Sequence, residues 1–234
     1  MNLPIDLIIC NTLDFPTAFR TIQYNEQFFN FKNKIILSNI SEKISGYKIF
    51  NVGKFNSIQE YSDFMPKLID YTESEYILLI QDDGHIVNPN NWTESFLDFD
   101  YIGAPWPTSK SWLKRFKKYS YFDTVKKNII KNRIGNGGFS LRSRKFLEIC
   151  SNFKSCENVP EDIFFCLLNY DLFIDNGIKF ADFNTAYKFS AEHSFGKINN
   201  RHPKSNPIFN VENHFGWHGK RFKNSNELIN LKFT

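Results

Sequence analysis

The segment EYILLIQDDG (residues 75–84) joins an apolar run to two adjacent carboxylates, and it decides how the first half of the chain is interpreted. The apolar run is short, uninterrupted and bounded by polar residues, which is typical of a strand buried on both faces of a sheet. Side chains on an extended segment alternate between its two sides, so Asp82 and Asp83 are expected to point apart. Asp83 therefore shares its side with Gln81 or with His85.

Further strands and helices alternate around this segment. Ser57 and Glu60 have the spacing of a capping box, which predicts the start of a helix. Strands separated by helices favour an α/β fold with a mostly parallel sheet flanked by helices. Ligands of such sheets bind beyond the carboxyl ends of the strands, so Cys10, Asn11 and Thr12 are expected on the same rim as Gln81 to Asp83. The predicted strands are 5–10, 33–39, 47–52 and 75–80, and the predicted helices are 15–29 and 57–71.

The composition indicates a globular protein and excludes several other classes. The chain has 234 residues, with 41% hydrophobic and 23% charged residues, and a net charge of +4 that suits anionic small molecules. Nucleic-acid binding is not expected, because the basic residues gather in one local stretch, 110–133, instead of forming a face with aromatics. No apolar run approaches the roughly 20 residues of a membrane span, and no basic leader precedes the first strand. A cytoplasmic protein is expected, with peripheral contact to a membrane as an alternative.

Four cysteines show no C-x-x-C spacing, which argues against zinc. Reduced, buried thiols are the expectation, and a Cys150–Cys156 disulfide is the less favoured alternative.

Each remaining polar motif has a structural and a functional interpretation. Asp83 at a strand end is either part of a solvated turn or a ligand for a hard divalent cation. Glu161 and Asp162 open a predicted helix, where acids favour the dipole, or one of them is a general base. The glycines of GNGG (135–138) mark either a flexible loop or a close approach of the backbone to a ligand.

The order of these motifs resembles a family of predicted glycosyltransferases with a GT-A-like fold, the DUF5672-like proteins. The elements that carry the resemblance extend from about residue 76 to residue 219. They are QDD (81–83), DYIGAPW (100–106), GNGGFSLRS (135–143), PEDIFF (160–165) and FGWH (215–218).

The resemblance implies transfer of a sugar, with inversion, from a nucleotide-sugar donor to a hydroxyl of a glycan or glycoconjugate. It implies a single domain, with a nucleotide-sugar-binding half at 1–100 and an acceptor half at 101–234. Gln81 and Asp83 occupy the two slots of a metal-binding D-x-D motif, so Asp83 and His218, with His214 as second choice, are the implied ligands of Mn²⁺ or Mg²⁺. The implied general base is Asp162, with Glu161 as the alternative or as an acceptor partner.

Further roles complete the expected site. Cys10, Asn11, Thr12, Gln81, Asp82 and Asp83 are expected to bind the donor, and Trp106, Asn136, Gly137 and Gly138 the acceptor. Trp106 either stacks on a sugar or anchors the core. The basic stretch 110–133 is either a lid over the diphosphate or a solvated surface. Two other functions stay open. A sugar nucleotidyltransferase would want a glycine-rich phosphate loop after the first strand, which CNTLDFPTAF lacks, and a catalytically inactive glycan-binding protein would explain the amide at Gln81.

Overall fold

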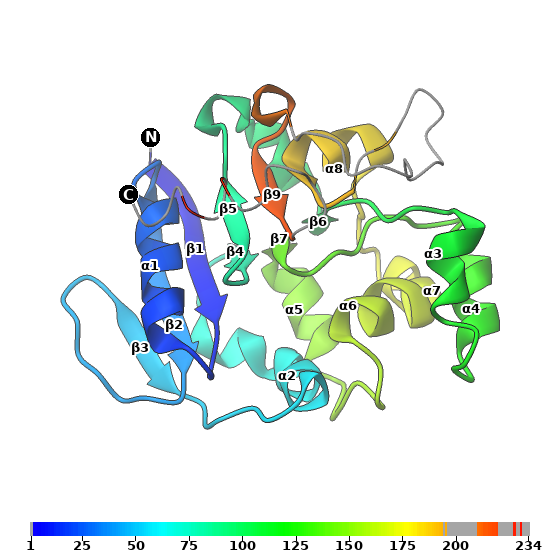
Figure 1. Ribbon diagram of the computed structural model, residues 1–234, viewed down its shortest axis with the longest axis horizontal. Helices are drawn as coiled ribbons and strands as arrows, with labels where there is room; N and C mark the ends of the chain where they lie inside the picture. The colour runs from blue at the N-terminus through cyan, green and yellow to red at the C-terminus, as the bar shows by residue number, and fades with distance from the viewer. Residues whose placement is uncertain (1, 194, 196–209, 220–226, 228–229, 231–234) are drawn as a thin grey trace.

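A six-stranded sheet in the order β3-β2-β1-β4-β7-β6 forms the centre of the protein (Figure 1). The structure is a computed structural model that describes residues 2–193, 195, 210–219, 227 and 230. Within this sheet, as described, β7 alone runs antiparallel to its neighbours β4 and β6. The strands are β1 (Asn2–Cys10), β2 (Asn30–Ser38), β3 (Lys48–Asn51), β4 (Tyr76–Ile80), β6 (Tyr101–Gly103) and β7 (Phe139–Ser143).

The apolar run of the opening segment is the middle of this sheet. Ile77 to Ile80 of β4 are completely buried, because β1 pairs with one edge of the strand and β7 with the other. A strand in that position presents both faces to packed side chains, so apolar residues occupy every position. The expected fold class, a mostly parallel α/β sheet flanked by helices, is confirmed.

Helices flank the sheet, with α1 packed on β1 and β2 and α5 packed on β7. The described α-helices are α1 (Phe15–Glu26), α2 (Ile58–Phe64), α3 (Lys110–Lys114), α4 (Phe122–Asn128), α5 (Arg144–Cys150), α6 (Glu161–Ile163), α7 (Tyr170–Asp175) and α8 (Phe183–Phe189). The 3-10 helices are η1 (Met65–Tyr71), η2 (Pro89–Asn91), η3 (Glu94–Asp98) and η5 (Val211–Asn213), and η4 (Phe164–Leu168) is a π-helix. Among the described helices, none is both long and apolar enough to cross a bilayer.

Two predicted helices are correct in place but not in form. The helix that starts after Ser57 changes to the 3-10 helix η1 at Met65, because Pro66 has no N–H to continue an α-helical ladder. The helix after Pro160 is α-helical for three residues and then widens into η4, where Asn169 N donates to Phe164 O across five residues. Ser57 does cap α2, since its side chain accepts from Glu60 N at 3.1 Å.

A second, three-stranded sheet in the order β5-β9-β8 lies beside the end of β4. Its strands are β5 (Gly84–Ile86), β8 (Ser190–Ala191) and β9 (Gly216–His218). β5 follows directly on QDD, and it pairs antiparallel with β9 so that Gly84 lies opposite His218. This pairing carries a histidine from near the C-terminus to the rim of the main sheet.

The described cysteines Cys10, Cys150, Cys156 and Cys166 are all free and buried, which confirms reduced thiols over the Cys150–Cys156 disulfide.

Candidate active site

Gln81, Asp83 and His218 come together at the carboxyl end of β4. His218 Nε2 lies 3.1 Å from Asp83 Oδ1 and 3.1 Å from Gln81 Oε1. Asp82 and Gln81 both line a pocket at this rim, whereas Asp83 lines neither that pocket nor the smaller one beside it. The shared contact with His218 brings Gln81 and Asp83 together, which is one of the two pairings that alternation predicted. His85, the other partner considered for Asp83, is buried and stacks on Trp217.

The three converging side chains are of kinds that could hold a divalent cation. Carboxylate, amide and imidazole groups are all ligands that Mn²⁺ accepts. In the described part of the chain, no three His, Cys, Asp or Glu residues form a metal-binding group. The third side chain at this point, Gln81, is an amide.

The charges around His218 favour its protonated form in the absence of a cation. Burial alone lowers the pKa of His218, but the hydrogen bond to Asp83 and the negative charges of Asp83, Glu192 and Asp162 outweigh it and raise the pKa above the ordinary value. A site that attracts a proton this way presents negative potential at the Nε2 atom, which is what a cation would also meet.

The glycines of GNGG are required by the side chains packed against them. A Cβ at Gly138 would lie 2.0 Å from His218 Nε2, and a Cβ at Gly137 would lie 2.2 Å from Glu161 Oε1. Gly138 O also accepts from Gln81 N at 2.8 Å, so this loop touches the end of β4 directly. These glycines let the backbone approach the side chains that surround a small pocket.

That small pocket, of about 150 Å³, is where the predicted catalytic and acceptor residues meet. The loop before β7, the start of α6 and the end of β9 contribute its walls. Its lining includes Gln81, Asn136, Gly137, Gly138, Glu161, Asp162 and His218.

The two adjacent carboxylates at the start of α6 have different surroundings. Arg142 Nη2, on β7, donates to Glu161 Oε1 at 2.9 Å, and both side chains are almost completely buried. Glu161 Oε2 is buried without a hydrogen-bond partner among the described residues. Asp162 is half-buried, and its Oδ1 accepts from Ile163 N at 2.8 Å. One oxygen of Glu161 is therefore held by an ion pair, which leaves Asp162 as the freer carboxylate.

Burial and the neighbouring charge of Glu161 raise the pKa of Asp162 to about 7. Glu192 raises this pKa further, and the hydrogen bond from Ile163 N and the charge of Arg115 oppose the increase. A carboxyl that titrates near neutral pH has the proton affinity expected of a general base.

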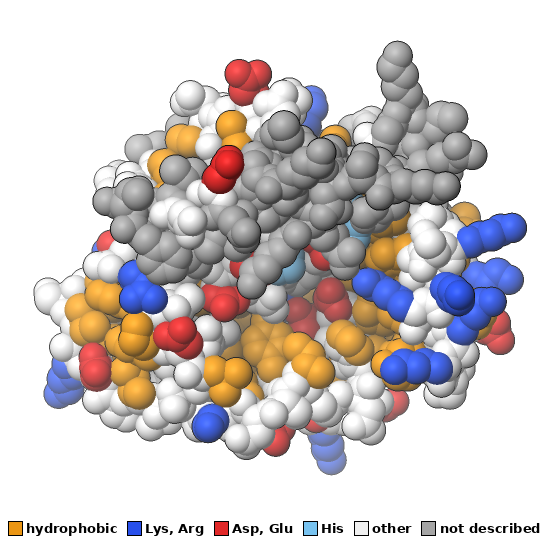
Figure 2. Space-filling model, viewed as in Figure 1, with side chains coloured by type: hydrophobic (Ala, Val, Ile, Leu, Met, Phe, Trp, Pro, Cys, Tyr) orange, Lys and Arg blue, Asp and Glu red, His pale blue; other side chains and the backbone are white. Residues whose placement is uncertain are grey.

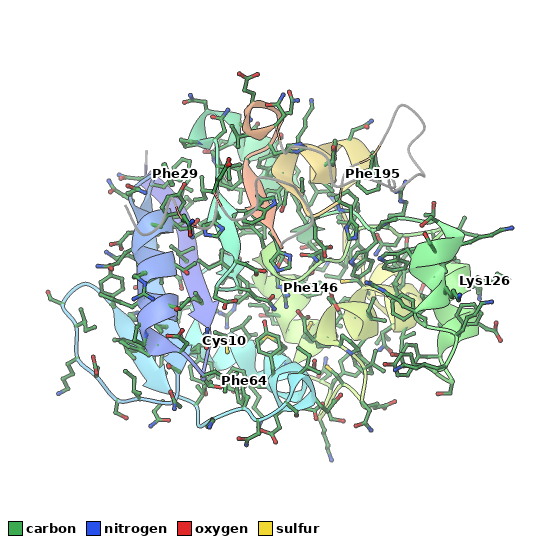
Figure 3. All side chains as sticks on the ribbon, viewed as in Figure 1. Cys10, Phe29, Phe64, Lys126, Phe146 and Phe195 are labelled. Carbon is green, nitrogen blue, oxygen red and sulfur yellow. The ribbon has the colours of Figure 1, made fainter. Side chains whose placement is uncertain are left out.

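A larger pocket, of about 470 Å³, adjoins the small one and opens beyond the ends of β1 and β4. Cys10, Asn11, Thr12 and Asp82, the predicted donor-binding residues, line it together with residues 55–58. Ile58, Tyr61 and Gln81 line both pockets, so the two pockets border each other at these side chains. Figure 3 labels Cys10 near Phe64, on the side of the molecule where α2 lies.

Three expected contributors lie elsewhere. Trp106 is 1% exposed and packs on Trp112 and on Gly135, where a Cβ would meet the indole at 2.3 Å, so its placement favours the core anchor over stacking on a sugar. His214 is buried, and its Nδ1 contacts Tyr187 O away from the small pocket. The basic stretch 110–133 lines neither pocket, and its role as a lid stays a prediction.

Two residues at the site were missed by the sequence reasoning. Tyr61 lies one turn after the cap Ser57, and its hydroxyl accepts from Gln81 Nε2 at 3.4 Å. Glu192 Oε2 accepts from Asn136 Nδ2 at 3.0 Å, and Asn136 Oδ1 in turn accepts from Gly138 N at 3.1 Å. Helix phasing from Ser57 was a signal for Tyr61, whereas Glu192 comes from a segment with no recognisable motif.

Residues 45–208 match a protein family described as "Protein of unknown function (DUF5672)". No curated protein matches the sequence.

Several solved structures are similar to this one at low sequence identity. The bifunctional IspDF of Campylobacter jejuni has 12% identity and a TM-score of 0.47, with 78% of this chain and 50% of that chain covered. A glucosyl-3-phosphoglycerate synthase of Mycobacterium tuberculosis, solved with Mn²⁺, UDP and glucosyl-3-phosphoglycerate, has 10% identity and a TM-score of 0.41, with 61% and 57% covered. A glycosyltransferase involved in glycosylation of the major capsid of PBCV-1 has 14% identity and a TM-score of 0.48, with 97% and 100% covered. The chain spans about half the length of the first two.

Proposed function

The chain belongs to the DUF5672 family, and from this premise and the geometry of the two pockets we propose that it is a glycosyltransferase. It moves a sugar from a nucleotide-sugar donor to a hydroxyl of a glycan or glycoconjugate acceptor. The observation that carries the proposal is that Ile58, Tyr61 and Gln81 line both pockets, so the large pocket borders the small one that holds Asp162.

The sizes and linings of the two pockets suit the two parts of such a donor. The large pocket has the volume of a typical small-molecule site, and it lies at the strand ends where nucleotides bind in open α/β sheets. The small pocket has room for a single sugar ring and is lined by amides, backbone groups and carboxylates that can bind hydroxyls. A diphosphate would then lie where the two pockets border each other, at Gln81 and next to Asp83.

Asp162 acts as the general base for the acceptor hydroxyl. Its carboxylate takes the proton of the acceptor hydroxyl while that oxygen forms a bond to the anomeric carbon of the sugar. The bond from the anomeric carbon to the diphosphate breaks, and the nucleoside diphosphate leaves with the electron pair. Glu161 Oε2 accepts a hydrogen bond from the acceptor or the sugar. Inversion follows when Asp162 and the leaving diphosphate lie on opposite faces of the ring.

Asp83 and His218, with Gln81 as a neutral third donor, are the residues that would hold Mn²⁺ or Mg²⁺. A cation bound there offsets the negative charge of the departing diphosphate. Because Gln81 brings no charge, the site carries a single carboxylate, and we expect a moderate affinity for the cation.

The expected division into halves is part of the same proposal. Residues 10–82 provide the lining of the large pocket, which supports a nucleotide-sugar-binding half at 1–100. Residues 136–138, 160–162 and 218 provide most of the small pocket, in which the sugar of the donor meets the acceptor hydroxyl, and this supports an acceptor half at 101–234.

A donor screen tests the proposal. Nucleotide sugars are incubated with the protein with and without Mn²⁺, and release of nucleoside diphosphate is measured. We expect hydrolysis or transfer with one class of donor, and its loss in Asp162→Asn. Asp175→Asn, which removes an exposed carboxylate on α7 outside both pockets, is the matched control and should keep full activity.

Two results would instead support the other functions. Release of pyrophosphate from a nucleoside triphosphate and a sugar phosphate would identify a nucleotidyltransferase. Sugar binding without turnover of any donor, unchanged in Asp162→Asn, would identify a glycan-binding protein.

A further inference from the structure

The positive charge of the chain is concentrated in residues 110–133. This segment holds nine of the 29 Lys and Arg residues and one of the 25 Asp and Glu residues, so it carries +8 while the rest of the chain carries −4. Figure 2 shows Lys and Arg side chains gathered over α3 and α4. Besides Lys131, six lysines in the segment are exposed: Lys110, Lys114, Lys117, Lys118, Lys126 and Lys127.

Apolar side chains project from the same segment. Ile130, just after α4, is 80% exposed, the highest value among the large hydrophobic residues of the described chain. Tyr119, between α3 and α4, is 41% exposed. The opposite side of the segment is fixed to the body of the protein, because Trp112, Phe116, Val125 and Ile129 are buried beneath it.

The exposed lysines lie outside the proposed donor site. The segment lines neither pocket. In Figure 3, Lys126 lies at the α4 edge of the molecule, well apart from Cys10 in the large pocket. Lys131, which is not among the six, forms an ion pair with Asp171 at 2.7 Å.

We propose that this surface, formed by the six exposed lysines with Tyr119 and Ile130, binds the anionic face of a lipid bilayer. Lysines near such a face are attracted by its negative potential, and an exposed aliphatic and an aromatic side chain gain by entering the boundary between headgroups and acyl chains. The proposal does not depend on the glycosyl-transfer function, because it concerns a different surface and needs no turnover.

A lipid surface fits these residues better than a nucleic acid does. Single-stranded nucleic acids bind by stacking bases on free aromatic faces. Here Tyr119 and Tyr121 stack on each other, with ring centroids 5.0 Å apart and planes 8° apart, and Lys118 Nζ lies 4.9 Å from the centroid of the Tyr119 ring. Ile130 offers an aliphatic side chain, which gains from hydrocarbon and not from phosphate.

Vesicle sedimentation tests the proposal. The full chain is mixed with vesicles of phosphatidylcholine alone or of phosphatidylcholine with phosphatidylglycerol, at low and at high salt. We expect binding to the anionic vesicles that weakens as salt rises. The double variant Lys117→Gln, Lys118→Gln should weaken binding by about 25-fold, at about fivefold per lysine. The matched control, Lys43→Gln with Lys54→Gln, removes two exposed lysines outside the segment and should leave binding within about twofold of wild type.

Ile130→Ser separates the apolar contribution from the electrostatic one. It should weaken vesicle binding while leaving the salt dependence unchanged, and the melting temperature of each variant shows that the fold is kept. Equal binding to neutral and anionic vesicles, or an equal loss in both lysine pairs, would overturn the proposal. Binding of a single-stranded oligonucleotide with no binding of anionic vesicles would also overturn it, in favour of a nucleic-acid surface.

Discussion

Asp162 is the titratable side chain on which the proposed chemistry depends most directly. Its pKa of about 7 means that the carboxyl loses its proton as the pH rises through neutrality. Because a general base acts in its deprotonated form, we expect kcat/KM to rise with pH and to level off above about pH 8. Asp162→Asn should lower the rate by about 10²–10⁴-fold and remove this step from the profile. Rates measured between about pH 5.5 and pH 9 check both expectations.

The same pKa makes a prediction for stability, and its sign is opposite to that of a typical surface carboxylate. The folded pKa of Asp162 lies above the ordinary value of 3.8, so the folded protein binds this proton more tightly than the unfolded chain does. The contribution of this proton to the free energy of unfolding is complete below the pKa of the unfolded chain, and it is lost as the pH rises through about 7. Asp162→Asn should therefore raise the free energy of unfolding at pH 8, by about 1–4 kcal/mol, and the gain should shrink towards pH 5. Urea unfolding at the two pH values measures it, and a less stable variant at pH 8 would show that ionised Asp162 supports the fold.

At the scale of elements, the long apolar runs were predictable from the sequence and the short strands were not. β1, β2, β3 and β4 follow from periodicity, because a strand buried on both faces leaves a continuous apolar signal. The sheet of β5, β9 and β8 joins pieces of two or three residues from distant parts of the chain, and pieces of that length have no periodicity to read.

Some features of the candidate site could also be predicted from the sequence, and others could not. Gln81, Asp83, Asp162 and His218 stand in motifs with a fixed order, so the sequence could nominate them before the structure placed them together. The burial of Trp106 depends on packing between elements, which composition and spacing do not record.

The contact between the loop before β7 and β9 can be tested by a pair of substitutions. In Gly138→Ala the new Cβ would lie 2.0 Å from His218 Nε2, so we expect a loss of about 1–3 kcal/mol of stability. His218→Ala removes the ring, and Gly138→Ala should cost less in that background. Unfolding of the wild type, both single variants and the double variant measures this coupling. Additive effects would contradict a direct contact between the two elements.

At the scale of the whole molecule, the reactivity of the four cysteines measures whether solvent reaches the described core. Cys10, Cys150, Cys156 and Cys166 lie in β1, in α5, in the loop before α6 and in η4, and each is buried and free. Burial raises the pKa of each thiol, to about 12 for Cys10, which leaves little thiolate at pH 8. We expect a thiol reagent to label the native protein very slowly and to label four thiols after unfolding without reductant. Two labelled thiols in the unfolded chain would reveal a disulfide.

The separation of charge between residues 110–133 and the rest of the chain has a kinetic consequence. A body with +8 on one side and −4 elsewhere has a large electric dipole moment, and a negatively charged surface exerts a torque on it from a distance. The molecule would turn its lysine-rich side forward during diffusion, so a larger fraction of collisions would be correctly oriented. The charge separation therefore raises the association rate. The effect disappears when salt makes the Debye length shorter than the distance at which the molecule must begin to turn towards the surface.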